Sequence, residues 1–309
     1  MIRVMNASGC LDALVAPAVA HGLDVFVSKT VTPEPRVGNA PVRIAETGVG
    51  MLNSIGLANP GIERFVREHL PALGELDCPL WVSVGGFSAD DYAECCETLD
   101  GESGVETIEL NVSCPNVTAP DEAATEIVAA ARQVTSKPLY AKLSPALPDV
   151  AAVAVAAQEA GANGLSLTNT LRGMALDPAT LRPRLSTATG GLSGPALRPV
   201  ALAAVYACAA ATNLPIVGMG GISTGEDALA FLAAGASDVA LGTVLFADPY
   251  APRRVREELA SATSSRGFTR PQDAIGSAHG DVTVAKRRQR IAAESALLLP
   301  ELATASTAL

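Results

Sequence analysis

Glu109-Leu110-Asn111-Val112-Ser113-Cys114-Pro115-Asn116 is the most informative segment of this chain. Its first half continues a short apolar run that predicts a buried strand, and its second half forms a loop that presents a thiol between two carboxamides. Such a loop can hold a planar, polar heterocycle by hydrogen bonds while a soft base removes a carbon-bound proton. We therefore expect residues of the active site at the end of this strand.

The same pattern, a short apolar run followed by an Ala/Leu-rich helical stretch, occurs eight times along the chain. Strands are predicted at residues 3–6, 25–28, 80–84, 107–112, 139–143, 164–168, 215–219 and 238–242. Helices are predicted at residues 11–20, 61–70, 89–99, 122–135, 149–160, 197–211, 225–234 and 253–265. Eight consecutive βα units favour a closed (β/α)8 TIM barrel of the α/β class over an open doubly wound sheet. We expect the barrel over residues 1–265 and a helical C-terminal extension over residues 266–309.

Composition and charge exclude several classes of protein. Of the 309 residues, 49% are hydrophobic and 17% charged, which suits one large core and argues against disorder. A net charge of −10 argues against binding to nucleic acid or anionic lipid. The longest apolar run, residues 200–211, is too short for a membrane helix, and the N-terminus lacks the features of a signal peptide, so we expect a cytoplasmic protein. The six cysteines form no C-x-x-C pair, which argues against disulfides, a metal site or an iron–sulfur cluster on this chain.

Two connections, residues 29–60 and 170–195, are too long for simple turns between a strand and a helix. Long ordered loops on the strand C-terminal side of a barrel are usually lids or walls of a site, so we expect both to cover the active site. In the tail, the basic residues 286–290 precede an Ala/Leu stretch. This pattern indicates an amphipathic docking helix rather than a basic binding arm, because the acidic bulk of the chain would weaken affinity for anions.

Glycine-rich loops follow the last two predicted strands, at residues 218–222 and 241–243. Barrel enzymes commonly bind phosphate there, and the helix beginning near Gly225 would add its positive dipole end. The alternative is that these glycines only form tight turns. No G-x-G-x-x-G follows the first strand, so the expected phosphorylated cofactor is FMN or pyridoxal phosphate rather than a Rossmann-bound nicotinamide.

Two lysines bear on the choice between these cofactors. Lys29 and Lys142 each end a predicted strand. A lysine in a barrel mouth is costly unless it faces an anion, a cofactor or water. One of them could form a Schiff base with a carbonyl, or either could lie beside the edge of a flavin where negative charge gathers on reduction. The remaining alternative is a solvated lysine on the rim.

Five amide side chains are expected at the same mouth: Asn6, Asn53, Asn111, Asn116 and Asn169. Together they suit a ligand with alternating carbonyl and N–H groups, such as a pyrimidine, because each amide offers donors and an acceptor.

Cys114 is the best candidate for a general base, since it ends a strand in a polar mouth and none of the three histidines does. The other cysteines are interpreted differently. Cys10 lies near the first strand end with no partner that singles it out, and four are expected to be buried core residues: Cys78, Cys95, Cys96 and Cys208.

Ten segments along the chain form one ordered set: Met5-Asn6-Ala7-Ser8-Gly9, Ser28-Lys29-Thr30, residues 34–39, residues 51–61, residues 111–116, Ala141-Lys142-Leu143-Ser144-Pro145, Thr168-Asn169-Thr170, residues 190–195, residues 218–222 and Leu241-Gly242-Thr243. Taken together and in order, these segments resemble the class 1 dihydroorotate dehydrogenases over about residues 5–249.

The resemblance implies an FMN-containing barrel that oxidises dihydroorotate to orotate, the redox step of pyrimidine biosynthesis. It implies that Cys114 takes the C5 proton while hydride leaves C6 for the flavin, assisted by Lys29. The implied orotate contacts are Lys29, Asn53, Gly56, Leu57, Asn111, Asn116, Asn169 and Thr170. The implied FMN contacts are Ala7, Ser8, Lys29, Asn111, Lys142, Gly194, Gly220, Gly221, Gly242 and Thr243.

Residues 45–51 and 190–195 look closer to the 1B branch of that family. That branch pairs with a second subunit carrying FAD and an iron–sulfur cluster and passes electrons to NAD, whereas the 1A branch works alone as a homodimer with fumarate. We expect a homodimer, with the electron-transfer subunit as a further partner.

Two departures from the family pattern leave alternatives open. The chain begins almost at its first strand, without the segment that helps to close the barrel floor, and its tail is longer, so the tail is one candidate to cover that floor. The alternatives are a paralogue acting on a related ring, a Schiff-base aldolase on the same barrel, and a flavin-binding subunit without turnover.

Overall fold

Eight parallel strands form the central sheet of the computed structural model, which describes residues 1–112 and 120–280. In spatial order the strands are β1 (Val4–Asn6), β12 (Asp238–Leu241), β11 (Ile216–Met219), β8 (Gly164–Leu167), β7 (Leu139–Leu143), β6 (Val105–Asn111), β5 (Leu80–Val84) and β2 (Phe26–Val27). A single parallel bridge between Met5 and Val25 joins the two ends of the sheet, so the barrel is nearly closed. All eight predicted strands are confirmed, each boundary to within two residues.

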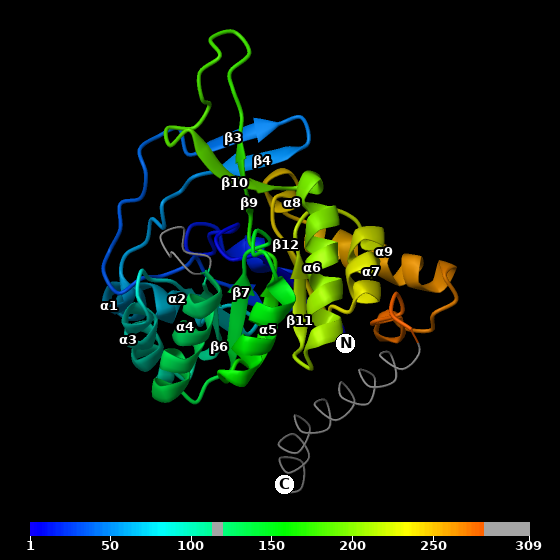
Figure 1. Cartoon of the computed structure of the whole chain (residues 1–309), viewed down its shortest axis with the longest axis horizontal. Helices are drawn as coiled ribbons and strands as arrows, with labels where there is room; N and C mark the ends of the chain where they lie inside the picture. The colour runs from blue at the N-terminus through cyan, green and yellow to red at the C-terminus, as the bar shows by residue number, and fades with distance from the viewer. Residues whose placement is uncertain (113–119, 281–309) are drawn as a thin grey trace, which may run out of the picture.

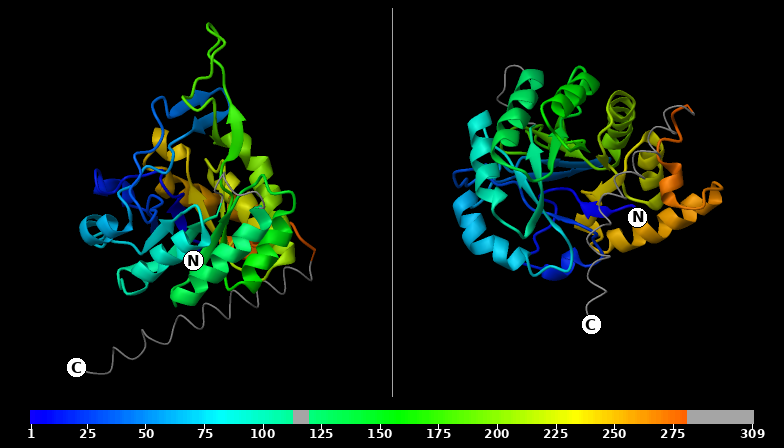
Figure 2. Two further views of the ribbon diagram at one scale, coloured as in Figure 1. Left: turned by 60° about the vertical axis from the view of Figure 1, so that its left-hand side comes forward. Right: turned by 90° about the horizontal axis from the view of Figure 1, so that it is seen from below.

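The helices that follow these strands surround the sheet, as the view from below shows (Figure 2). They are α1 (Ile62–Arg64) continuing through η2 (Phe65–His69) into α2 (Leu70–Leu73), then α3 (Ala89–Asp100), α4 (Pro120–Val134), α5 (Val150–Glu159), α6 (Arg198–Ala211), α7 (Gly225–Ala234), the short α8 (Val244–Ala247) and α9 (Ala251–Ser265). The prediction of a helix at residues 11–20 is wrong. A turn occupies residues 13–15 of that stretch, and only η1 (Pro17–Ala20) is helical, because Pro17 lacks an N–H group and disfavours a helical conformation in the residue before it.

The floor of the barrel is filled by side chains of the strands themselves. Trp81 and Tyr140 pack with their ring centroids 4.5 Å apart inside a separate apolar cluster. The guanidinium of Arg3 lies 5.3 Å from the Trp81 ring centroid and forms an ion pair of 2.9 Å with Asp238. Arg3, near the start of the chain, therefore helps to close the floor of the barrel.

A second, antiparallel sheet stands over the carboxyl ends of the barrel strands (Figure 1). Its order is β3 (Ile44–Thr47), β4 (Gly50–Asn53), β10 (Thr189–Ser193), β9 (Leu171–Met174). These strands come from the two long connections, which therefore lie on the expected side of the barrel. Their strand character was not predicted, because they are short, rich in glycine and mostly half-exposed.

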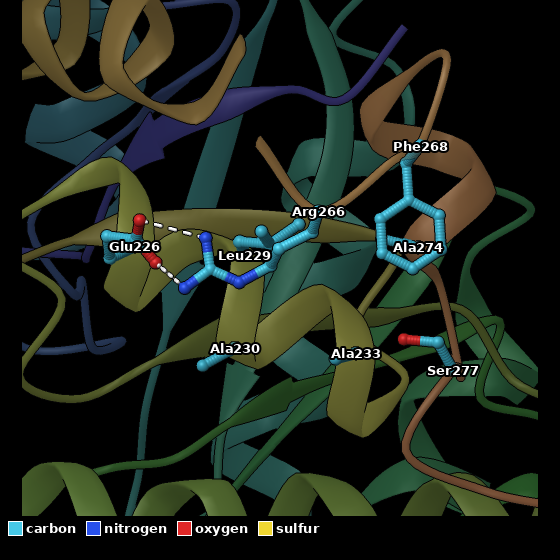
Figure 3. A pocket seen from close by; sticks show the side chains of 8 residues that line it. All are labelled: Glu226, Leu229, Ala230, Ala233, Arg266, Phe268, Ala274 and Ser277. Carbon is cyan, nitrogen blue, oxygen red and sulfur yellow. Dashed lines mark hydrogen bonds and ion pairs between the residues drawn. The ribbon is translucent and has the colours of Figure 1, made fainter. Parts of the chain in front are cut away.

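The described part of the C-terminal extension, residues 266–280, packs on α7. Backbone N–H groups of Gly276 and Ala278 donate to the carbonyls of Leu232 and Ala233, and the His279 ring donates to the carbonyl of Ala234 at 2.8 Å. A cavity of about 150 Å³ remains between this segment and the outer face of α7 (Figure 3), lined by Glu226, Leu229, Ala230, Ala233, Arg266, Phe268, Ala274 and Ser277. The expected docking helix beyond it, with residues 286–290, lies outside the described residues. In the part of the chain that the structure describes, no helix has the length and apolarity to cross a membrane.

Candidate active site

Two lysines, one buried and one half-buried, mark the mouth of the barrel. Lys142, on β7, is only 5% exposed; its ammonium donates to Ser8 Oγ at 2.8 Å and lies 3.4 Å from Oε1 of Glu109 on β6. Lys142 is therefore not the solvated rim lysine of the alternative interpretation.

Lys29 reaches the same place from the loop after β2. Its side chain lies across Gly9, where an added Cβ atom would be 2.8 Å from Lys29 Cδ and 3.3 Å from its ammonium nitrogen. Within residues 1–112 and 120–280, this ammonium has no hydrogen bond or ion pair. Burial lowers the pKa of Lys29, and repulsion from Lys142 lowers it further, while the Cys10 thiol opposes the shift. Such a group is stabilised by an anion that enters the mouth.

A row of polar side chains crosses the mouth beside the lysines. Asn169 donates to Asn111 Oδ1 at 2.8 Å, and Asn111 donates to Thr30 Oγ1 at 3.3 Å. The backbone N–H of Thr170 donates to Asn169 Oδ1 at 2.7 Å. Because Thr30 follows β2, Asn111 ends β6 and Asn169 follows β8, the parallel strands bring together amides that are far apart in sequence.

Asn53 joins this row from the small sheet. Its amide donates to the Gly191 carbonyl at 3.3 Å, and Gly191 in turn lies against Thr170, whose Oγ1 would be 2.1 Å from a Cβ atom added there. The loop that follows contributes Gly56 and Leu57, both at positive φ. Among the described residues, neither of their N–H groups donates to a protein acceptor, so both can donate to a ligand.

Asn6 does not belong to the ligand-facing amides, contrary to the expectation from sequence. Its side chain is fully buried; Oδ1 accepts from the N–H of Val27 and Nδ2 donates to the carbonyl of Val27, each at 2.8 Å. The amide thus replaces sheet hydrogen bonds at the seam between β1 and β2.

Three glycine-containing loops converge on the other side of the mouth. Gly194 follows β10, and Gly220 and Gly221 follow β11. Thr243 Oγ1 donates to Ser193 Oγ at 2.8 Å. A Cβ atom at Gly221 would be 2.6 Å from the Gly194 carbonyl oxygen, and the φ of Gly221 is +80°, so only glycine fits without strain. In the described chain no protein acceptor takes the N–H groups of Gly220, Gly221 or Thr243, which leaves them for an anion.

The first turn of α7 does not add to this anion site as expected. The N–H of Gly225 donates to Glu258, that of Asp227 donates to Thr224, and those of Ser223 and Thr224 donate to the Asp227 carboxylate. Two carboxylates therefore already lie at the positive end of this helix.

The loop with Cys114 and Asn116 lies outside the described residues, so their predicted positions stay predictions. Of the expected core cysteines, Cys95, Cys96 and Cys208 are buried, and burial raises the pKa of Cys96 to about 12. Cys78 is only half-buried, contrary to expectation. The described residues contain no group of three or more His, Cys, Asp or Glu side chains that could hold a metal ion.

Sequence reasoning missed several groups at the mouth. Cys10 lies beside Ala7 near Gly242, with Lys29 and Lys142 close enough to oppose the rise in its thiol pKa that burial causes. Glu109 carries the carboxylate that pairs with Lys142. The hydroxyls of Ser166 and Thr168, on and just after β8, are buried and find no partner within the described part of the chain.

Comparisons with known proteins agree with this geometry. Residues 3–262 match the family model described as dihydroorotate dehydrogenase. The chain is 42% identical to a Listeria monocytogenes protein over 87% of its own length and 92% of the relative's. It is 43% identical to a Bacillus pumilus protein over 88% of its own length and 91% of the relative's. Both relatives are named dihydroorotate dehydrogenase B (NAD(+)), catalytic subunit.

Solved structures lead to the same family. The crystal structure of DHODH from Eimeria tenella in complex with ferulenol superposes with a TM-score of 0.75 at 27% identity, covering 90% of this chain and 85% of that one. The ligand-free enzyme from the same organism superposes with a TM-score of 0.75 at 26% identity, over 89% of this chain and 88% of that one. Because the family model spans the whole barrel and the relatives match over most of both lengths, this chain belongs to the dihydroorotate dehydrogenase family.

Proposed function

We propose that this protein oxidises (S)-dihydroorotate to orotate in pyrimidine biosynthesis, with FMN bound at the mouth of the barrel. One observation carries the proposal: buried Lys142, half-buried Lys29 and a row of amides meet at a single mouth. A ring that bears a carboxylate and alternating carbonyl and N–H groups is the chemical complement of that surface. The matched family of oxidoreductases favours this reaction over the Schiff-base aldolase.

The residues present fit FMN. The N–H groups of Gly220, Gly221 and Thr243, which have no acceptor within residues 1–112 and 120–280, suit its phosphate, with Gly194 beside them. Ala7, Ser8, Lys29, Asn111, Lys142 and Gly242 are the proposed remaining contacts. The Thr168 hydroxyl, which is buried and has no hydrogen-bond partner among the residues that the structure describes, also favours a polar ligand there.

When bound, the flavin supplies the acceptor for the hydride that leaves C6 of the substrate. Cys114 is the proposed base for the C5 proton, since its loop directly follows Asn111. Lys29 would bind the ring carboxylate, and the amides Asn53, Asn111, Asn116 and Asn169, with Thr170 and the N–H groups of Gly56 and Leu57, would orient the ring. The small sheet over the mouth would exclude water from the reacting atoms.

Anaerobic mixing of the purified chain with dihydroorotate tests this function. Loss of flavin absorbance together with release of orotate supports the proposal. Cys114→Ala should retain the flavin and lose the reaction, whereas Cys10→Ala, the matched thiol at the same mouth, should keep it. The reverse result would assign the base to Cys10, and a colourless protein that borohydride traps on a carbonyl substrate would support the aldolase instead.

We further propose that the chain is the catalytic subunit of a cytoplasmic 1B-type enzyme, a homodimer that works with a second subunit carrying FAD and an iron–sulfur cluster. The names of the relatives, which include NAD(+) and "catalytic subunit", support this assignment. NAD reduction by dihydroorotate should require the second subunit. Efficient fumarate reduction by the chain alone would argue for the 1A type.

The proposed division is a barrel over residues 1–265 and an extension over residues 266–309. A chain truncated after residue 265 tests it: retained flavin binding would make the extension dispensable for the site.

A further inference from the structure

Three charged groups lie together at the mouth of the barrel. They are the ammonium groups of Lys29 and Lys142 and the carboxylate of Glu109; Glu109 is 1% and Lys142 5% exposed, and Lys29 is half-buried. The adjacent Cys10 adds no charge, because burial raises the pKa of its thiol despite the two lysines. Two cations and one carboxylate leave this cluster, defined as Lys29, Lys142 and Glu109, with a net charge of +1.

The carboxylate is not shared equally between the two lysines. Glu109 Oε1 lies 3.4 Å from the Lys142 ammonium, and the same ammonium donates to Ser8 Oγ at 2.8 Å. Strands β6 and β7, which carry Glu109 and Lys142, are paired directly, so this pair is held by the sheet. Lys29, on a loop, has no anionic partner in the described part of the chain. The positive charge left over is therefore that of Lys29.

We propose that Glu109 is a positioning residue that holds Lys142 against Ser8 and limits the net charge of this cluster to +1. The inference rests on the proposed function, because it assigns the cluster to the bound flavin and the monoanionic ring. One uncompensated cation matches one ring carboxylate. A reduced flavin carries more negative charge than an oxidised one, so each positive charge beside it favours the reduced form. Glu109 would thus keep the bound flavin from being stabilised too strongly in its reduced state.

Four holoproteins reconstituted at saturating FMN test this role: the parent chain, Glu109→Gln, Lys142→Met and the double variant. Their cluster charges are +1, +2, 0 and +1. We expect the flavin midpoint potential to become more positive in Glu109→Gln, more negative in Lys142→Met, and to return towards the parent value in the double variant. For each single variant, the ratio of the affinities for reduced and oxidised flavin should change about tenfold.

Thermal unfolding of the same proteins separates charge from folding. If the role of Glu109 were merely structural, Glu109→Gln would lower the melting temperature and leave the flavin potential unchanged. The double variant would then not restore the melting temperature. Glu109→Asp, which keeps the charge, should stay near the parent potential. Equal potentials in all four proteins would overturn this inference alone, whereas a chain that binds no flavin would overturn the proposed function and the inference with it.

Discussion

Replacing Asn6 by Ala should destabilise the fold without involving the ligand, because this amide joins the first and second strands of the barrel. Both polar ends of the side chain bond to the backbone of Val27 at 2.8 Å. Val27 is 1% exposed, so the variant leaves one buried N–H and one buried carbonyl unpaired. Each unsatisfied group costs about 1–3 kcal/mol, which gives a loss of about 2–6 kcal/mol in the free energy of unfolding. That is a large fraction of the roughly 5–15 kcal/mol that stabilises a native protein.

Urea unfolding of the flavin-free chain measures this loss without interference from bound cofactor. Asn53→Ala is the matched control, since its amide makes one hydrogen bond to the half-buried Gly191 carbonyl. We expect the control to lose less than about 1.5 kcal/mol of stability and to weaken ring binding instead. If Asn6→Ala unfolded at the urea concentration of the parent and lost only ligand affinity, the amide would belong to the ligand site and the seam interpretation would be wrong.

Three further variants test separate parts of the site. Gly221→Ala places a Cβ atom 2.6 Å from the Gly194 carbonyl oxygen at a φ of +80°. We expect backbone strain of about 1–2 kcal/mol and at least about tenfold weaker FMN binding in a fluorescence titration. Unchanged FMN affinity would contradict the phosphate site. Because the folded chain lowers the pKa of Lys29, the unfolded chain binds more protons at this group, so Lys29 should contribute a rise in the stability of the flavin-free protein with pH, from that lowered pKa towards about 10.4, the ordinary lysine value. The difference in pH-dependent urea unfolding between the parent and Lys29→Met isolates this contribution from that of the buried thiols, and the same pH dependence in both proteins would exclude Lys29 as a source. Cys114→Ala should reduce turnover by about 10²–10⁴-fold in a steady-state assay, and full activity would remove this thiol from the mechanism.

The barrel could be predicted because each strand is a short apolar run at a regular distance from an Ala/Leu-rich helix. Strand β7, for example, is buried along its whole length and was located to the residue. The small sheet could not be found in this way. Its strand β10 contains two consecutive glycines and no fully buried position, so the chain shows no alternation of apolar and polar residues there.

The sequence predicts which types of residue line the site, but not the role of each side chain. Asn6 and Asn111 both end strands of the barrel, yet one side chain closes a seam and the other faces the mouth. That difference depends on the weak pairing of β1 with β2, which is a property of the closed barrel rather than of either segment. Glu109 was detectable in principle, because it lies two residues before Asn111 on the same strand and so shares its inward face.

An anaerobic titration of the purified, flavin-loaded chain with dihydroorotate tests the central claim, that a flavin and the ring substrate react at this mouth. We predict that flavin absorbance is lost in proportion to added substrate and that one orotate forms per flavin reduced. A flavin that stays oxidised with excess dihydroorotate, in a protein whose melting temperature shows that it is folded, would contradict the proposed function.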